Sequence, residues 1–171
     1  MKILRVVAPG HDEQLDAGMR EAIAAFNRGV DIRLRFLSIL VEQVEVRVAE
    51  PEAAAEQVNA AIDQERPAVA LLSGHGETAL AAAAACVRRG VPLARLGAGA
   101  RHGEHADAAR GIDRLSGQLL VLDAAAAAAL EDEGLAERAV RVEGTDPAAV
   151  GARVIKALRA LRARGGGERT C

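Results

Sequence analysis

Short apolar runs alternate with amphipathic stretches along the whole chain. The runs are Ile3 to Val7, Val30 to Phe36, Val44 to Val48, Ala68 to Leu72, Pro92 to Leu96, Leu119 to Leu122 and Val140 to Val142. Apolar runs of this length, separated by helical stretches, are typical of parallel β units with helical crossovers. The pattern therefore predicts an α/β fold of three layers, Rossmann-like, with a mostly parallel sheet flanked by helices.

The runs also differ in how their apolar residues are spaced. Ala68 to Leu72 and Leu119 to Leu122 are continuously apolar, as expected of central parallel strands whose two faces are both covered. Val30 to Phe36 alternates with charged residues, which predicts a strand toward an edge. Only seven residues separate Phe36 from Val44, whereas a parallel crossover needs roughly a dozen. We therefore expect the strand at Val44 to Val48 to form an antiparallel hairpin with its predecessor, or to be very short.

Helices are expected between the strands, on the evidence of apolar positions at helical spacing and of capping residues. The predicted helices are Asp12 to Phe26, Pro51 to Gln64, Thr78 to Arg89, Ala124 to Leu130, and a last helix that begins at Asp146 and Pro147. Residues 1–164 are expected to form a single domain. Residues 165–171 have no apolar anchor and are expected to form a disordered tail.

Composition narrows the classes of function. A net charge of −2 and 1% aromatic residues argue against a nucleic-acid surface. Cys86 and Cys171 lack any metal-ligand spacing, which favours a reduced, cytoplasmic setting. No segment approaches the roughly 18 apolar residues of a membrane span, so no membrane association is expected. Neither a dinucleotide fingerprint nor a P-loop occurs, and no cofactor is predicted.

Polar residues follow three of the expected parallel strands, namely Ile3 to Val7, Ala68 to Leu72 and Pro92 to Leu96. Ligands bind at the carboxyl ends of parallel strands, and all four histidines of the chain are predicted to lie there. Imidazoles among carboxylates act as general acids, general bases or metal ligands. The candidate catalytic residues are His75, His102 and Glu104, and the candidate metal ligands are His75, His102 and His105. The alternative is that polar residues simply collect in surface loops, where Glu77 or Thr78 complements a helix N-terminus.

Glycines lie in the same loops and extend the candidate site. Glycine lets the backbone approach a ligand and adopt positive φ, although a tight turn needs the same residue without any ligand. The candidate ligand-binding residues are Gly10, His11, Gly74, Gly76, Glu77, Thr78, Gly99 and Arg101.

The stretch "ERPAVALLSGHGETALAAAAACVRRGVPLARLGAGAR", residues 65–101, resembles the amino-terminal half of the non-hydrolysing UDP-N-acetylglucosamine 2-epimerases. That family reads Gly-Asp-Thr-x-Thr-Thr-Leu-Ala-Ala and then Gly-Ile-Pro-Val-Ala-His-Val-Glu-Ala-Gly-Leu-Arg. The residues in register are Gly74, Thr78, Leu80, Ala81, Gly90, Pro92, Ala94, Ala98, Gly99 and Arg101. A weaker likeness continues to about Leu158.

The resemblance implies one half of a GT-B architecture, in which a nucleotide sugar lies between two Rossmann-like domains. The second domain, which supplies most of the nucleotide contacts in that family, has no counterpart in this sequence. The family's aspartate after the central strand is His75 here, and its glutamate is Gly97. Because carboxylates perform the proton transfers of epimerisation, full epimerase activity is not expected of this chain alone, and whether it is an enzyme stays open.

Three functions remain open on the sequence. The first is a single-domain protein that binds a nucleotide sugar or a related small anion at the rim of the sheet. The second is an interaction subunit that completes a cleft with itself, as a homo-oligomer, or with a separate second-domain partner. The third is a repurposed enzyme with a histidine and glutamate acid–base site or a metal-dependent site.

Overall fold

The protein folds around a parallel sheet, seen in a computed structural model that describes residues 1–29, 40–101, 103–142 and 146–167. Within these residues the sheet has six strands in the order β2-β1-β3-β4-β5-β6, and every neighbouring pair is parallel. The strands are β1 (Lys2–Val7), β2 (Glu42–Arg47), β3 (Val69–Ser73), β4 (Leu93–Leu96), β5 (Gln118–Val121) and β6 (Ala139–Arg141). The chain starts at β1, one strand in from the edge, passes first to β2 at that edge and then builds the other side of the sheet from β3 to β6.

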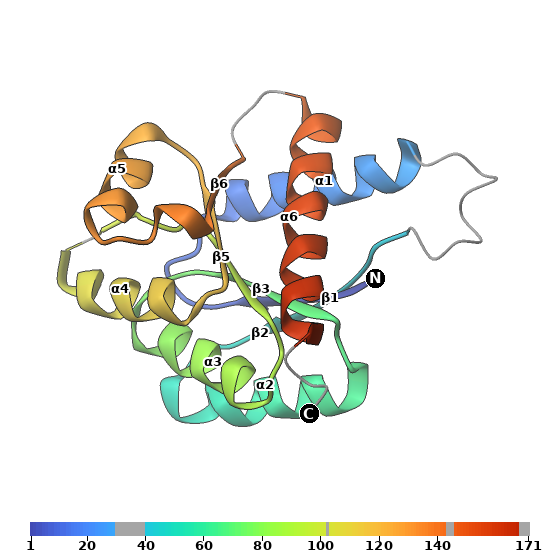
Figure 1. Ribbon diagram of the computed structural model, residues 1–171. Coiled ribbons are helices and arrows are strands. Elements are labelled where there is room, and N and C mark those ends of the chain that lie inside the picture. The colour runs from blue at the N-terminus through green and yellow to red at the C-terminus, as the bar shows by residue number, and fades with distance from the viewer. Residues whose placement is uncertain (30–39, 102, 143–145, 168–171) are drawn as a thin grey trace.

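Helices cover both faces of the sheet (Figure 1). They are α1 (Glu13–Gly29), α2 (Pro51–Glu65), α3 (Gly76–Arg88), α4 (Ala106–Leu115), α5 (Ala124–Asp132) and α6 (Pro147–Gly167), with short 3-10 turns η2 (Gly103–His105) and η3 (Ala136–Arg138). Helices α1 and α6 pack together on one face, while α2, α3 and α4 lie side by side on the other. The three-layer α/β architecture predicted from the sequence is confirmed.

The core follows from the alternation of side chains along each strand. On β1, Ile3 packs toward α1 and α6, whereas Leu4 and Val6 pack toward α2 and α3. Strands β3 and β5 are buried along their whole length, which confirms their predicted central positions. Cys86 lies on the core side of α3, where burial raises the pKa of its thiol to about 12, so it does not serve as a nucleophile at neutral pH.

Strand β2, at one edge of the sheet, differs from what was expected for Val44 to Val48. It is not very short, because it pairs with β1 over six residues, and this pairing is parallel. The connection from β1 to β2 contains α1, which satisfies the length that a parallel crossover requires. The predicted strand over residues 30–36, and with it the hairpin and the alternating edge pattern, lies outside the described residues.

Two further differences concern helices. Helix α4 was not predicted, because its inward face carries Asp113 as well as Ala109 and Ile112. Helix α6 extends to Gly167, three residues past the predicted start of the tail at residue 165, and residues 168–171 lie outside the described residues. Of the helices in the described part of the chain, none combines the length and the apolarity that crossing a membrane demands.

Candidate functional site

A hollow of about 220 Å³ opens at the carboxyl ends of β1, β3, β4 and β5. It includes the crevice between β1 and β3, where the strand order reverses and where ligands bind in open α/β sheets. Its walls consist of Gly10, His11, Asp12, Leu15, Ser73, Gly74, His75, Arg95, Leu96, Gly97, Ala100, Leu122 and Asp123. The strand ends that the sequence identified therefore come together at one concave place.

The loop after β1 is held by its own polar groups. Asp12 accepts hydrogen bonds from the backbone N–H groups of Gln14 and Leu15 at 2.9 and 3.0 Å, which satisfies the first turn of α1. The Nδ1 atom of His11 lies 2.9 Å from the carbonyl oxygen of Ala8, a contact in which Nδ1 donates. His11 thus lines the hollow with one ring nitrogen tied to its own loop.

The loop after β3 is built on two glycines with positive φ, Gly74 at +111° and Gly76 at +82°. The backbone N–H of His75 donates to the carbonyl of Pro9 at 3.1 Å, which joins this loop to the one after β1. The His75 ring lies directly on Gly10, where any Cβ would come within 2.3 Å of it. Gly10 is therefore required by a close approach of the two loops, with or without a ligand.

His75 also occupies the N-cap position of α3, and its side chain makes no capping hydrogen bond. By contrast, Asp123 caps α5 by accepting from the backbone N–H of Ala126 at 2.8 Å. The N-terminus of a helix carries partial positive charge and unsatisfied N–H groups. Helix α3 begins at this hollow without a side-chain cap on its first N–H groups, and Glu77 lies in its first turn.

Two imidazoles meet beside the hollow. The ring centroids of His75 and His105 are 5.0 Å apart with an interplanar angle of 34°. Glu104 lies 3.8 Å from Nε2 of His105, and its side chain is 89% exposed. His102 lies outside the described residues, and in the remainder no group of three potential ligands could hold a metal ion. The metal set of His75, His102 and His105 thus stays a prediction.

An ion pair supports the floor of the hollow. Arg5 on β1 contacts Asp16 on α1 at 2.5 Å, and both side chains are buried. Ser73, which lines the hollow, donates its hydroxyl to the same carboxylate at 3.1 Å. Burial by itself would raise the pKa of Asp16, but the hydrogen bonds and charge of Arg5 outweigh it, so this pKa lies below its usual value.

The lowered pKa of Asp16 predicts a contribution to stability that depends on pH. A depressed carboxyl pKa stabilises the folded state above the unfolded value of about 4, and this contribution is lost as the pH falls through the folded pKa. An Asp16→Asn variant should be less stable than wild type at pH 7, and the difference should shrink below about pH 4. Urea unfolding between pH 3 and 7 measures it, with the exposed Asp132→Asn as control; a difference independent of pH would contradict the prediction.

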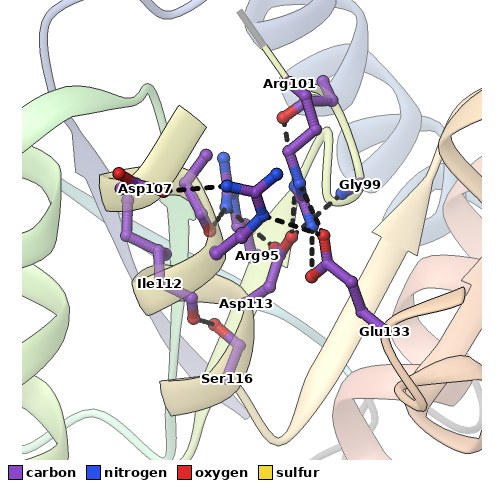
Figure 2. A network of polar contacts seen from close by, with 11 residues as sticks. Arg95, Gly99, Arg101, Asp107, Ile112, Asp113, Ser116 and Glu133 are labelled. Carbon is purple, nitrogen blue, oxygen red and sulfur yellow. Dashed lines mark hydrogen bonds and ion pairs between the residues drawn. The ribbon is translucent and has the colours of Figure 1, made fainter. Parts of the chain in front are cut away.

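A second polar network lies between β4, α4 and the end of α5 (Figure 2). At its centre is Asp113, fully buried, which contacts the guanidinium groups of Arg95 and Arg101 at 2.8 Å each. It also accepts a hydrogen bond from the backbone N–H of Gly99 at 3.2 Å. Glu133 completes the network by pairing with Arg101 at 2.8 Å. The loop after β4 is thereby fixed to α4 from within.

This network changes the interpretation of Arg101. Its guanidinium donates to Asp113, to both oxygens of Glu133 and to the carbonyl of Ala100, and it does not line the hollow. The pKa of Arg101 is raised because these hydrogen bonds outweigh the opposing effect of burial. The contacts give Arg101 a role in holding the loop, and its predicted ligand contact stays a prediction.

Arg95, which the sequence analysis did not single out, lines the hollow instead. Only 2% of it is exposed, and burial lowers its pKa more than Asp113 raises it. Its Nε has no hydrogen-bond acceptor among the described residues. The sequence did contain a signal for Arg95, because it is a cation in the middle of an apolar strand. A charge buried in this way needs a specific partner.

Of the other predicted ligand-binding residues, some lie at or beside the hollow and others lie away from it. Thr78 is 7% exposed and approaches the carbonyl of Ala49 at 3.5 Å, away from the hollow. Glu77 is exposed on α3. A Cβ on Gly99 would lie 2.2 Å from the carbonyl oxygen of Ala126, so close packing against α5 accounts for this glycine. Of the eight candidates, Gly10, His11 and Gly74 line the hollow, and Gly76 opens the helix beside it.

The arrangement has the elements of an anion site rather than of a carboxylate-driven reaction. The lining carboxylates in the described part of the chain are Asp12 and Asp123, and each caps a helix. A buried arginine, a helix N-terminus and glycine-rich loops are the groups that bind phosphate and carboxylate. The imidazoles of His11 and His75 add groups that can donate or accept a proton.

Neither a scan against protein-family models nor a search of curated proteins finds a match for this chain. The search of solved structures does, and its matches include UDP-N-acetylglucosamine 2-epimerases. S. aureus MnaA in a co-structure with UDP matches with TM-score 0.63 and 16% identity, covering 82% of this chain and 44% of that chain. The enzyme from Rickettsia bellii gives TM-score 0.62 and 18% identity, with coverage of 96% and 48%.

A third neighbour is UDP-GlcNAc 2-epimerase from Methanocaldococcus jannaschii in complex with UDP-GlcNAc and UDP. It matches with TM-score 0.62 and 16% identity, covering 83% of this chain and 46% of that chain. The chain thus spans slightly less than half the length of these three structures. Its fold is similar to one half of them, which confirms the predicted resemblance at the level of the fold.

Proposed function

We propose that the hollow binds the anionic part of a nucleotide sugar, or a related small anion, at the carboxyl rim of the sheet. The observation that carries the proposal is the pairing of buried Arg95 with the N-terminus of α3, which lacks a side-chain cap. Both favour negative charge at the same place. The similarity to structures that contain UDP or UDP-GlcNAc supports this class of ligand.

We further propose that the hollow is one wall of a larger cleft. Pockets for small organic ligands usually enclose roughly 300 to 1,000 Å³, whereas this hollow measures about 220 Å³. Its size suits one portion of a nucleotide sugar, and the remainder would be enclosed by a second domain. A separate partner, or a second copy of this chain, supplies that domain in this proposal.

The decisive experiment substitutes the residue at the N-cap of α3. In His75→Asp, the carboxylate caps the first turn and places negative charge where the anion would bind. In the resembling family, which carries aspartate at this position, a second domain supplies most of the nucleotide contacts, whereas here the anion is proposed to lie on the first turn of α3 itself. Binding of UDP, measured by isothermal titration calorimetry, should therefore weaken at least about tenfold, or ~1.4 kcal/mol. Because an aspartate cap stabilises a helix by about 1 kcal/mol, the variant should remain folded.

His75→Asn is the matched control for this substitution. It removes the same ring and offers a similar neutral cap, so it isolates the effect of charge. UDP binding should fall less in His75→Asn than in His75→Asp. Equal affinity in the two variants, or no binding of UDP or UDP-GlcNAc by the wild-type chain, would overturn the proposed anion site.

A proton-transfer or metal-assisted role is the second candidate, and the contact between His75 and His105 is the observation that favours it. Titration with zinc at pH 6 and pH 8 distinguishes the two functions. Stoichiometric zinc binding that strengthens with pH and disappears in His105→Gln favours the second candidate.

A further inference from the structure

The hollow at the carboxyl rim has two chemically different sides. Arg95, His75 and the N-terminus of α3 form the polar side, where the proposed function places the anion. The other side is apolar. A Cβ on Gly97 would lie 4.0 Å from Cδ2 of Leu15 on α1 and 3.8 Å from Cδ1 of Leu122, which follows β5. We call Leu15, Gly97 and Leu122 the apolar wall; all three line the hollow and are partly exposed.

Gly97 leaves space open beside the two leucines. Its φ of +71° is one that residues with a side chain rarely adopt. The two Cβ distances are ordinary van der Waals contacts, so the site is roomy and not closed by a neighbouring backbone. The backbone N–H of Gly97 donates to the carbonyl of Leu120 at 3.0 Å and is therefore not available to a ligand. Gly97 contributes room to the hollow, and its N–H contributes no polar contact.

A sugar ring would find few hydrogen-bond partners on the apolar wall. The described residues that line the hollow include no asparagine, glutamine or glutamate. Asp12 and Asp123 flank the wall, but both are exposed and serve as helix caps. The carbonyl of Ala100 already accepts from Arg101 at 3.2 Å. Burying a hydroxyl without a partner is unfavourable, and one such hydroxyl in an apolar pocket weakens binding by up to about a hundredfold.

We propose that the ligand of this hollow is a small anion that carries an apolar group, such as an alkyl or aryl phosphate or carboxylate, and that Gly97 makes room for that group. This ligand class rests on the proposed anion site and narrows it, because it disfavours a sugar ring next to the anion. Arg95 and Gly97 are two residues apart at the end of β4, roughly 7 Å along an extended chain, so one small molecule reaches both. Removing an apolar ring from water against two leucines favours binding, while the anion faces Arg95 and the first turn of α3.

A matched pair of phosphate esters tests the ligand class. Cyclohexyl phosphate and glucose 1-phosphate carry the same phosphate group on a saturated six-membered ring, but the cyclohexyl ring has no hydroxyls. Isothermal titration calorimetry of the wild-type chain should give a Kd at least about tenfold lower for cyclohexyl phosphate. Inorganic phosphate, which offers the anion alone, should also bind at least about tenfold more weakly than cyclohexyl phosphate.

Leu122→Asn tests the apolar wall itself. Asparagine is close to leucine in size but carries an amide that pairs with hydroxyls, so the preference for cyclohexyl phosphate should fall at least about tenfold. Leu115→Asn is the matched control, because Leu115 is a 36% exposed leucine on α4, away from the hollow, and it should keep the preference. Circular dichroism checks folding. If Leu122→Asn does not fold, Gly97→Asn places the same amide on the wall, since asparagine tolerates positive φ.

The outcomes separate this ligand class from the anion site on which it rests. Tighter binding of cyclohexyl phosphate that is lost in Leu122→Asn and kept in Leu115→Asn supports the proposal. If UDP binds but glucose 1-phosphate binds as tightly as cyclohexyl phosphate, the ligand class is overturned and the anion site stands. A preference that survives in the variant of the wall also overturns the class. If neither UDP nor any of the three phosphates binds, both proposals fall.

Discussion

Replacing Asp113 by alanine is expected to cost about 3 to 5 kcal/mol of the free energy of unfolding. The carboxylate is fully buried and contacts Arg95 and Arg101 at 2.8 Å each. Without it, Arg95 keeps its charge in the core with only the carbonyl of Ala109 as an acceptor among the described residues, and the N–H of Gly99 loses its acceptor. The loss is a large fraction of the roughly 5 to 15 kcal/mol that stabilises a domain.

Urea unfolding followed by circular dichroism measures the effect of Asp113→Ala. The matched control is Asp107→Ala on the same helix, where the carboxylate is 96% exposed and pairs with Arg110. Because a surface pair of this kind contributes only about 0.3 to 0.5 kcal/mol, the control should unfold almost as wild type does. Similar stability of the two variants would contradict the assignment of Asp113 as the centre of the buried network.

The order of strands and helices was largely predictable from sequence, for a physical reason. Apolar runs such as Leu119 to Leu122 report burial on both faces, and burial on both faces is what a central parallel strand experiences. Helix α4 was not predicted from the sequence because its inward face includes Asp113. The charge of Asp113 is compensated by Arg95, which lies on a strand elsewhere in the chain. An analysis of periodicity treats a charged position as exposed. Only the contact with Arg95 in the folded protein shows that Asp113 is buried.

The candidate site was predictable in outline but not residue by residue. The glycine and histidine loops do line one hollow, because carboxyl ends of parallel strands share an edge. The sequence could not show that the His75 ring would lie on Gly10. Nor could it show that Arg101 is bound by Asp113 and Glu133. These contacts depend on the distance between loops, which motif spacing does not encode.

Substitution of Gly151 by alanine should destabilise the protein by about 1 to 3 kcal/mol, or more if the helices cannot shift. Gly151 is buried on α6, and a Cβ there would lie 2.0 Å from the carbonyl oxygen of Ala22 on α1. Backbone atoms cannot move aside as a flexible side chain does, so α6 would have to withdraw from α1. That movement would also loosen the buried core residues Ile155 and Leu158.

Gly18→Ala makes the same chemical change in the facing helix and should have the opposite sign. Gly18 is exposed on α1 with nothing within 4 Å of its Cβ position, so alanine should stabilise the helix by about 0.5 to 1 kcal/mol. Thermal and urea unfolding of the two variants would resolve the difference. If Gly151→Ala were as stable as Gly18→Ala, the close contact of α1 and α6 could not be what fixes the position of α6. In that case helix propensity alone would govern both sites, and α1, which is capped by Asp12 and carries Asp16, would not depend on α6 for its place beside the hollow.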